Sequence, residues 1–406
     1  MRIQKEDTMS NTRLNIEEEA KALNPRIVEW RRHFHAHPEI VLDTPETEAF
    51  IVAELEKMGV TKIRRGLAEH GIAALIEGKR PGKTLGLRSD MDALNIKEDT
   101  GLPFSSTNDF MHACGHDAHM AMVLGAAKIL TERTDELEGT VKLIFQPSEE
   151  STQGAGAQKM IRDGVLSDPA VDGIVGLHTG NLWKGVASGE VGWRFGSLMA
   201  SSDFFAVTFH GKGGHGATPH LTVDPIAMAC QAYSALQLIA SRETSPFEPV
   251  VLSIGAIQGG AAENVIPPSC TLRGSFRALN AATRETLHAR LKKICEDIAD
   301  ALRGSVEVTF MDGPPPLVND RGMTDKLRAA ASAVLGAERV HELEEPTMGA
   351  EDMAVYLEKV PGTFFFLSSF RADAPYPHHH PKFDVDESVL WAGSAVFAQF
   401  ALTWQS

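Results

Sequence analysis

The 406-residue sequence lacks the features that mark secreted or membrane proteins. Four cysteines are too few for a disulfide framework in a chain of this length. No apolar run reaches the roughly 18 residues that a membrane helix needs. The first residues also lack the apolar core of a secretory signal. We therefore expect a cytoplasmic protein that spans no membrane.

Basic residues are scarce relative to acidic ones. The chain has 39 Lys and Arg against 54 Asp and Glu, a net charge of -15, and no long basic run. This balance argues against nucleic acid or an anionic membrane as a partner, because both are bound through clustered positive charge.

Apolar runs rich in Val, Ile and Leu alternate with helical patterns in the first half of the chain. They predict buried strands and therefore an α/β fold, a mostly parallel sheet flanked by helices. Ligand sites in such sheets form beyond the carboxyl ends of the strands. The predicted strands are residues 72–76, 84–88, 141–145 and 171–177, with a helix over 117–130.

The pattern changes near residue 197. It then predicts strand, helix, two strands, helix and strand, which is the order of a ferredoxin-like α+β domain. The simplest organisation is a discontinuous catalytic domain, residues 13–196 and 313–406, interrupted by an inserted domain, residues 197–312.

Potential metal ligands gather where the predicted strands end. Cys114 and His116 lie in the segment HACGHDAH, Glu150 follows one strand and His178 ends another. Thiolate and imidazole together suit zinc best among common metals. Each segment alone also fits a plainer interpretation, such as a helix start, a solvated acidic turn or a structural histidine. Their coincidence at one edge of the sheet favours a metal centre.

Several neighbouring residues fit supporting roles. A carboxylate beside a metal-bound water can move its proton, and Glu149 stands next to Glu150. Asp92 or Asp117 could orient a ligating imidazole, and His112 and His119 fit outer positions.

Other histidines and cysteines are harder to place. One residue of the triplet 378–380 could complete the ligand set, whereas the alternating histidines of RRHFHAHPE would diverge on a helix. Cys230, Cys270 and Cys295 lie in apolar patterns and are predicted to be buried.

The inserted domain carries two glycine-rich segments, GKGGHGATPH and GAIQGGAAENVIP. Either could be a flexible turn. Alternatively, His215 could face a substrate oxyanion, Asn264 could donate hydrogen bonds and Arg277 could bind a carboxylate.

Taken together, these segments resemble the M20 metallopeptidase family, in its amidohydrolase branch. The resemblance extends from residue 31 to about residue 404. The matching segments are RRHFHAHPE, RSDMDAL, HACGHDAH, FQPSEE, GLH, GKGGHGATPH, ENVIP, GAEDMAVYL and HHHPKFDVDE.

The resemblance implies a hydrolase with two divalent metal ions, for which zinc is expected and manganese or cobalt are alternatives. It implies that Glu149 is the general base and acid, and that His215 stabilises the oxyanion from a partner subunit. Asn264 and Arg277 resemble substrate-binding positions, and the inserted domain would act as a lid and pair subunits into a homodimer. The implied metal ligands are Cys114, His116, Glu150, His178 and His379.

We therefore predict hydrolysis of the amide bond of a small N-acyl amino acid by a metal-activated water. A dipeptidase acting on short peptides is the alternative. A non-catalytic ligand sensor is disfavoured because Glu149 is present. A structural zinc protein is disfavoured because closed zinc sites use Cys and His rather than carboxylates.

Overall fold

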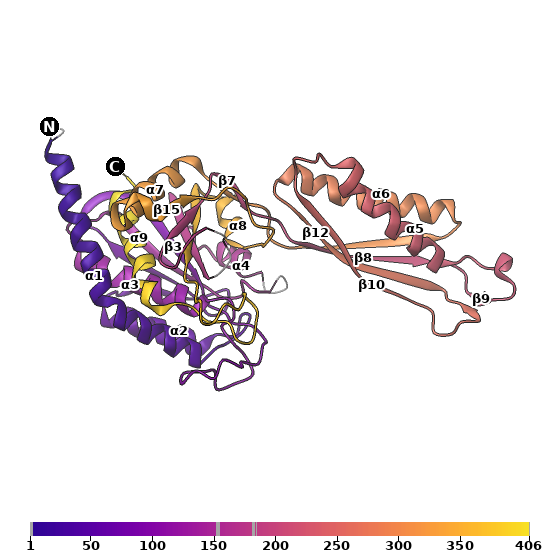
Figure 1. The fold of residues 1–406 in the computed structure, drawn as a ribbon, viewed down its shortest axis with the longest axis horizontal. Helices are drawn as coiled ribbons and strands as arrows, with labels where there is room; N and C mark the ends of the chain where they lie inside the picture. The colour runs from indigo at the N-terminus through magenta and orange to yellow at the C-terminus, as the bar shows by residue number, and fades with distance from the viewer. Residues whose placement is uncertain (1–2, 152–154, 181–182, 184, 406) are drawn as a thin grey trace. The chain divides into compact units, whose positions relative to one another are not determined.

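The chain divides into two compact units, which are described separately. The computed structural model describes residues 3–151, 155–180, 183 and 185–405, with the side chains of the first helix from Ile16 onward. The first unit comprises Met1–Gly196, Val318–Glu345 and Val355–Ser406, and the second comprises Ser197–Leu317 and Pro346–Ala354. Figure 1 shows the elements of each unit along the chain.

Within the described residues, eight strands form the sheet of the first unit. The four strands at its centre are mutually parallel, and an antiparallel pair lies at one edge. In spatial order the strands are β1 (Lys62–Leu67), β2 (Gly71–Glu77), β4 (Glu138–Gln146), β3 (Arg80–Asp90), β5 (Gly173–Gly180), β16 (Gly362–Ser368), β6 (Val191–Trp193) and β15 (Val340–Glu342). This mixed α/β fold agrees with the prediction, although β1, β6 and β15 were not anticipated.

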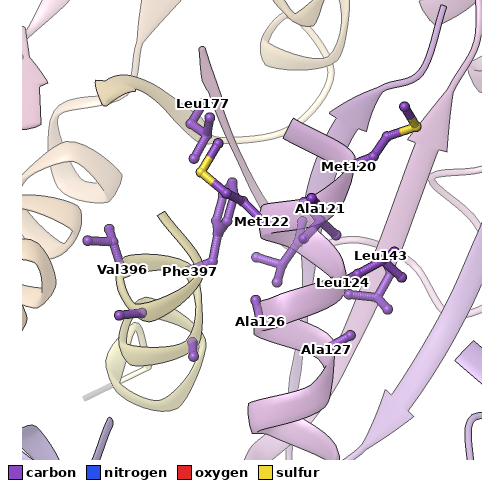
Figure 2. Packing of buried hydrophobic residues seen from close by; sticks show 14 of the residues in the cluster. Met120, Ala121, Met122, Leu124, Ala126, Ala127, Leu143, Leu177, Val396 and Phe397 are labelled. Carbon is purple, nitrogen blue, oxygen red and sulfur yellow. The ribbon is translucent and has the colours of Figure 1, made fainter. Parts of the chain in front are cut away.

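Helix α3 (His116–Glu132) is the central helix of the first unit because apolar or small residues occupy all of its faces. Figure 2 shows α3 between α9 and the sheet, with Met122 towards Leu177 and Phe397. Gly125 permits this approach, since a Cβ there would lie 2.2 Å from Ser394 Oγ. The other helices of the first unit are α1 (Ile3–Ala36), α2 (Pro45–Lys57), α4 (Gly156–Arg162), α7 (Arg321–Leu335) and α9 (Leu390–Thr403). Helix α8 (Met353–Leu357) begins in the last two residues of the Pro346–Ala354 segment and continues into the first unit.

The second unit contains a four-stranded antiparallel sheet with two helices on one face. Its elements are β8 (Asp203–His210), α5 (Pro225–Leu238), β10 (Val250–Gly259), β12 (Ser269–Ala278), α6 (Ala281–Ala301) and β13 (Ser305–Asp312), and the strand order is β10-β12-β8-β13. This is the arrangement of a split βαβ unit. Short ladders join β9 (Gly214–His215) to β11 (Val265–Ile266), and β7 (Gly196–Met199) to β14 (Leu317–Asn319).

Two details of the sequence prediction are corrected by the structure. The segment Pro346–Ala354 belongs to the second unit, where Gly349 O accepts a hydrogen bond from Ala200 N, so residues 313–406 are not all in the first unit. Cys230 is exposed, whereas Cys270 and Cys295 are buried as expected. The buried stripe of α5 includes Ala229 and Ala232, and the helical period places Cys230 outside this stripe. The described helices include none with both the length and the apolar character of a membrane span.

Candidate metal centre

The parallel register of three strands brings the predicted ligand segments to one edge of the first unit's sheet. Strands β4, β3 and β5 are parallel neighbours, so the residues that follow β3 and β4 and the last residues of β5 share that edge. Glu150 follows β4, and His178 lies near the end of β5. Cys114 and His116 enter from the start of α3, where Gly115 has a positive φ of 87°. His379, with φ 63°, enters from the segment between β16 and α9.

The five predicted ligands meet at this edge. Cys114 Sγ lies 3.4 Å from His178 Nε2. Glu150 Oε1 lies 3.8 Å from His116 Nε2 and 3.4 Å from His379 Nε2. The ligand atoms form two triads that share the sulfur of Cys114, and the atoms of each triad lie within 4.8 Å of one another. This arrangement offers two adjoining places for a cation.

The hydrogen bonds of two imidazoles leave lone pairs directed into the cluster. His116 Nδ1 donates to Asp92 O at 2.8 Å, and His178 Nδ1 donates to Thr179 O at 2.8 Å, so Nε2 of each ring is the unprotonated nitrogen of the neutral form. Among the described residues, neither His116 Nε2 nor Glu150 Oε1 has a hydrogen-bond partner, although both atoms are buried. A buried polar atom without a partner is costly, and a bound cation would satisfy both atoms, taking the place of the proton that the neighbouring carboxylates otherwise hold on His116. The residues present therefore fit a metal.

The electrostatics of the cluster also favour a cation. Burial raises the pKa of the Cys114 thiol well above its ordinary value, and the carboxylates of Glu150 and Glu149 raise it further. Burial opposes protonation of His116, but Asp90 and the other carboxylates outweigh it and raise its pKa to about 10. Burial lowers the pKa of His178, which keeps that ring neutral. A thiolate can form here only with a compensating positive charge, which a divalent ion supplies.

Asp92 joins the ligand segments through both its main chain and its side chain. Its carbonyl oxygen accepts from His116 Nδ1, and its buried carboxylate accepts from Glu149 N at 2.9 Å and Glu150 N at 3.1 Å. The turn that it holds contains Ser148 with φ 62°, a left-handed conformation that non-glycine residues seldom adopt. Glu149 Oε2 lies 3.9 Å from His116 Nε2, beside the ligand atoms. Asp92 therefore sets the direction of His116, Glu149 and Glu150 together.

Asp117, the other candidate for orienting a ligand, has a different set of partners. Its carboxylate pairs with Arg31 Nε at 2.7 Å and with His35 Nδ1 at 2.8 Å. His35 belongs to the tract RRHFHAHPE, and its other ring nitrogen lies 3.2 Å from Glu98. The tract thus braces the start of α3.

His119, for which an outer position was predicted, pairs behind the ligands with Asp90, a partner that the sequence did not indicate. His119 Nδ1 bonds Asp90 Oδ1 at 2.7 Å, and His119 Nε2 accepts from Thr179 N at 2.9 Å, so both ring nitrogens are occupied. Asp90 Oδ2 also pairs with the buried Arg88 at 3.1 Å. The two acids Asp90 and Asp92, at the end of β3 and just beyond it, were the sequence signal that could have indicated this side of the site.

The remaining histidines near the cluster make other contacts. His378 Nε2 donates to Thr179 O at 2.9 Å, and its ring lies against that of His178. His380 stacks on Tyr376, with ring centroids 4.6 Å apart. His112 is buried, and neither of its ring nitrogens has a hydrogen-bond partner among the described residues.

The three predicted substrate residues belong to the second unit. His215 is exposed on β9 and pairs with Val265 on β11, and Gly216 N donates to the carbonyl oxygen of Asn264, just before β11, at 2.8 Å. Arg277, on β12, donates to Met348 O at 2.7 Å. The structure therefore brings His215 and Asn264 together at the β9–β11 ladder, and places Arg277 in the four-stranded sheet of the same unit.

The chain is similar to known proteins in both sequence and structure. Residues 86–403 match the family described as peptidase family M20/M25/M40. The chain is 39% identical to the N-acetyl-L-cysteine deacetylase of Bacillus subtilis, over 94% of this chain and 90% of that protein. It is 36% identical to thermostable carboxypeptidase 1 of Saccharolobus solfataricus, over 96% and 98%. A crystal structure from Bacillus subtilis, described as a dinuclear metal binding peptidase from the M20 family, matches with a TM-score of 0.81 at 34% identity, over 94% and 98% of the two chains.

Proposed function

The chain belongs to the peptidase family M20/M25/M40, and from this premise we propose that it is a metal-dependent amidohydrolase that cleaves the amide bond of N-acyl amino acids. The observation that carries the proposal is the cluster of candidate ligands around the buried Cys114, with Glu149 beside it. The similarity to a deacetylase of an N-acetyl amino acid supports this substrate class.

In this proposal, five side chains hold two divalent ions. Zinc is the expected metal because a thiolate and imidazoles contribute, and manganese or cobalt are alternatives. When bound, such a pair of ions lowers the pKa of a water ligand and stabilises negative charge on the substrate's carbonyl oxygen. The ligands are Cys114, His116, Glu150, His178 and His379.

Glu149 acts as the proton carrier. Its carboxylate lies 3.9 Å from His116 Nε2, beside the ligand atoms, where it can take a proton from the attacking water. It then delivers that proton to the leaving amine. Asp92 keeps the carboxylate in place by holding the main chain of residues 149 and 150.

The second unit is proposed to be a lid and a dimerisation domain inserted into the catalytic domain. His215 stabilises the oxyanion, reaching it from the partner subunit of a homodimer. Asn264 and Arg277 bind the substrate's carbonyl or carboxylate group. His215 is exposed and lies close to Asn264, which supports a role for both in contacting a substrate.

A peptidase activity is the second candidate function. The 36% identity to a protein named as a carboxypeptidase favours it, since a C-terminal peptide bond is also an amide that joins an acyl group to an amino acid. The two candidates differ in the acyl group that the enzyme accepts.

A substrate panel with two glutamate variants tests the proposal. The metal-stripped protein is reloaded with zinc, manganese or cobalt and assayed on N-acetyl, N-benzoyl and long-chain acyl amino acids and on dipeptides. Glu149→Ala should lower kcat by ~10²–10⁴-fold and keep its metal, whereas Glu150→Ala should lose metal. Parent activity in Glu149→Ala would remove Glu149 from its role. Turnover of dipeptides alone would favour the peptidase.

A further inference from the structure

His379 differs from the other proposed ligands in how the fold holds it. Cys114, His116, Glu150 and His178 lie at the ends of sheet strands or at the start of α3. His379 lies in residues 369–386, which form no helix or strand. We call these residues the C-terminal ligand segment. Its position near the sheet therefore depends on individual contacts, such as His379 N to Ala113 O at 2.8 Å.

One buried arginine connects this segment to α3. Arg31, on α1, has no solvent-exposed surface. Its guanidinium lies 2.7 Å from Asp117, 2.8 Å from Asp384 and 3.2 Å from Glu387. Asp117 directly follows His116, and Asp384 lies five positions after His379. A single planar cation thus contacts the neighbours of two proposed ligands that stand more than 260 positions apart in the sequence.

The other cation on Asp384 cannot replace this connection. Arg371 also pairs with Asp384, but Arg371 lies within the C-terminal ligand segment itself. Among the described residues, Arg31 is the cation that joins Asp384 to Asp117. Without it, two buried carboxylates would lose their shared counter-charge. Of the two parts that Arg31 connects, the C-terminal ligand segment would move and α3 would not, because α3 is enclosed by the core.

We infer that Arg31 is a positioning residue of the metal centre, which ties the segment carrying His379 to the helix start carrying His116. The inference rests on the proposed function only in requiring that the centre binds two ions. Loss of Arg31 should therefore weaken the ion held by Glu150 and His379 and spare the ion held by Cys114, His116 and His178.

Cobalt titration of the metal-free full-length chain tests the inference without any substrate. Arg31→Met removes the charge and keeps much of the side-chain volume. We expect the second cobalt ion to bind about 10–100-fold more weakly, as is typical when a partner of a metal ligand is lost. The first ion, and the sulfur-to-cobalt absorption that reports Cys114, should be unchanged. Arg31→Lys should recover part of the affinity.

The neighbouring Arg32 provides a matched control. It is on the same helix and also pairs with Glu387, at 2.6 Å, but its side chain is 48% exposed and it contacts neither Asp117 nor Asp384 through an ion pair. Arg32→Met should bind both ions as the parent does. If Arg31→Met fails to fold, Asp384→Asn decides, because it leaves Arg31 paired with Asp117 and Glu387 and should weaken only the second ion.

Three results would overturn the inference. The first is that Arg31→Met or Asp384→Asn binds both cobalt ions as tightly as the parent chain does. The second is that both ions are weakened equally, and the third is that the parent chain binds fewer than two cobalt ions. A parent chain that binds two ions but hydrolyses no amide would instead remove the proposed function and leave the role of Arg31 intact.

Discussion

Replacing Asp92 by Asn tests how the site holds its two glutamates. The Asp92 carboxylate is buried and accepts two main-chain N–H groups, from Glu149 at 2.9 Å and from Glu150 at 3.1 Å. Asn has nearly the same shape, but one oxygen becomes an NH₂ group that cannot accept. One N–H of the turn must then lose its bond.

The size of the effect follows from the charge of the acceptor. A hydrogen bond to a charged group contributes about 1.5–3 kcal/mol. The turn also contains Ser148 in the left-handed region, which costs roughly 1–2 kcal/mol, so the bonds to Asp92 offset local backbone strain. Since about 1.4 kcal/mol corresponds to a tenfold change, kcat/KM should fall by about 10–150-fold. Part of the loss should appear in metal affinity, because Glu150 moves with Glu149.

The assay is the dependence of kcat/KM on metal concentration with an N-acyl amino acid substrate, alongside metal content. Asp109→Asn is the control, since it makes the same chemical change at a carboxylate that is 79% exposed and pairs with Lys97. An Asp92→Asn enzyme that stays within twofold of the parent in both quantities would refute the reasoning.

Two further predictions concern stability. Lys142 is buried and donates to the carbonyl oxygens of Val165, Ser167 and Pro169, so Lys142→Met should lower the free energy of unfolding by about 2–4 kcal/mol in urea denaturation. The control is Lys62→Met, at an exposed ion pair, which should change the free energy of unfolding by less than about 1 kcal/mol. Equal effects of the two substitutions would contradict this account. Burial alone would raise the pKa of Glu98, but bonds from His35, Thr100 and Ser106 outweigh it and lower the pKa from 4.5 to about 2. Because the folded pKa lies below the unfolded one, this stabilisation is complete above pH 4.5 and is lost as the pH falls towards 2. Urea midpoints of the metal-free chain should therefore drop more steeply between pH 5 and 3 (roughly the range of carboxylate titration) than those of Glu98→Gln, and parallel curves would argue against the effect.

The sheet edge at the candidate metal centre was predictable because its causes are local. Strands β3, β4 and β5 are marked by short Val, Ile and Leu runs, and parallel strands present their carboxyl ends at one edge. The residues that follow such runs, including Glu150, therefore had to come close to one another. Cys230 was mispredicted although its signal was also local. The buried stripe of α5 includes Met228, Ala229 and Ala232, and a helical period leaves Cys230 outside it.

The partners behind the ligands had no comparable signal. Asp90 and His119 are bonded because β3 and α3 pack together, and the sequence spacing between them does not indicate it. The choice of His379 among three successive histidines depends on its φ of 63° and on its bond to Ala113 O. A resemblance to known proteins had suggested His379, but no pattern within the triplet distinguished it.

The amino-acid sequence alone determined which chemical groups this protein can bring to a metal and which strands carry most of them. Strand and helix periods depend on neighbours a few positions away, so they can be recognised in one dimension. Only the tertiary structure decided that Arg31 reaches both Asp117 and Asp384, and that Asp92 holds two glutamates at once. Such contacts join residues tens to hundreds of positions apart, and they exist because the whole core packs in one way.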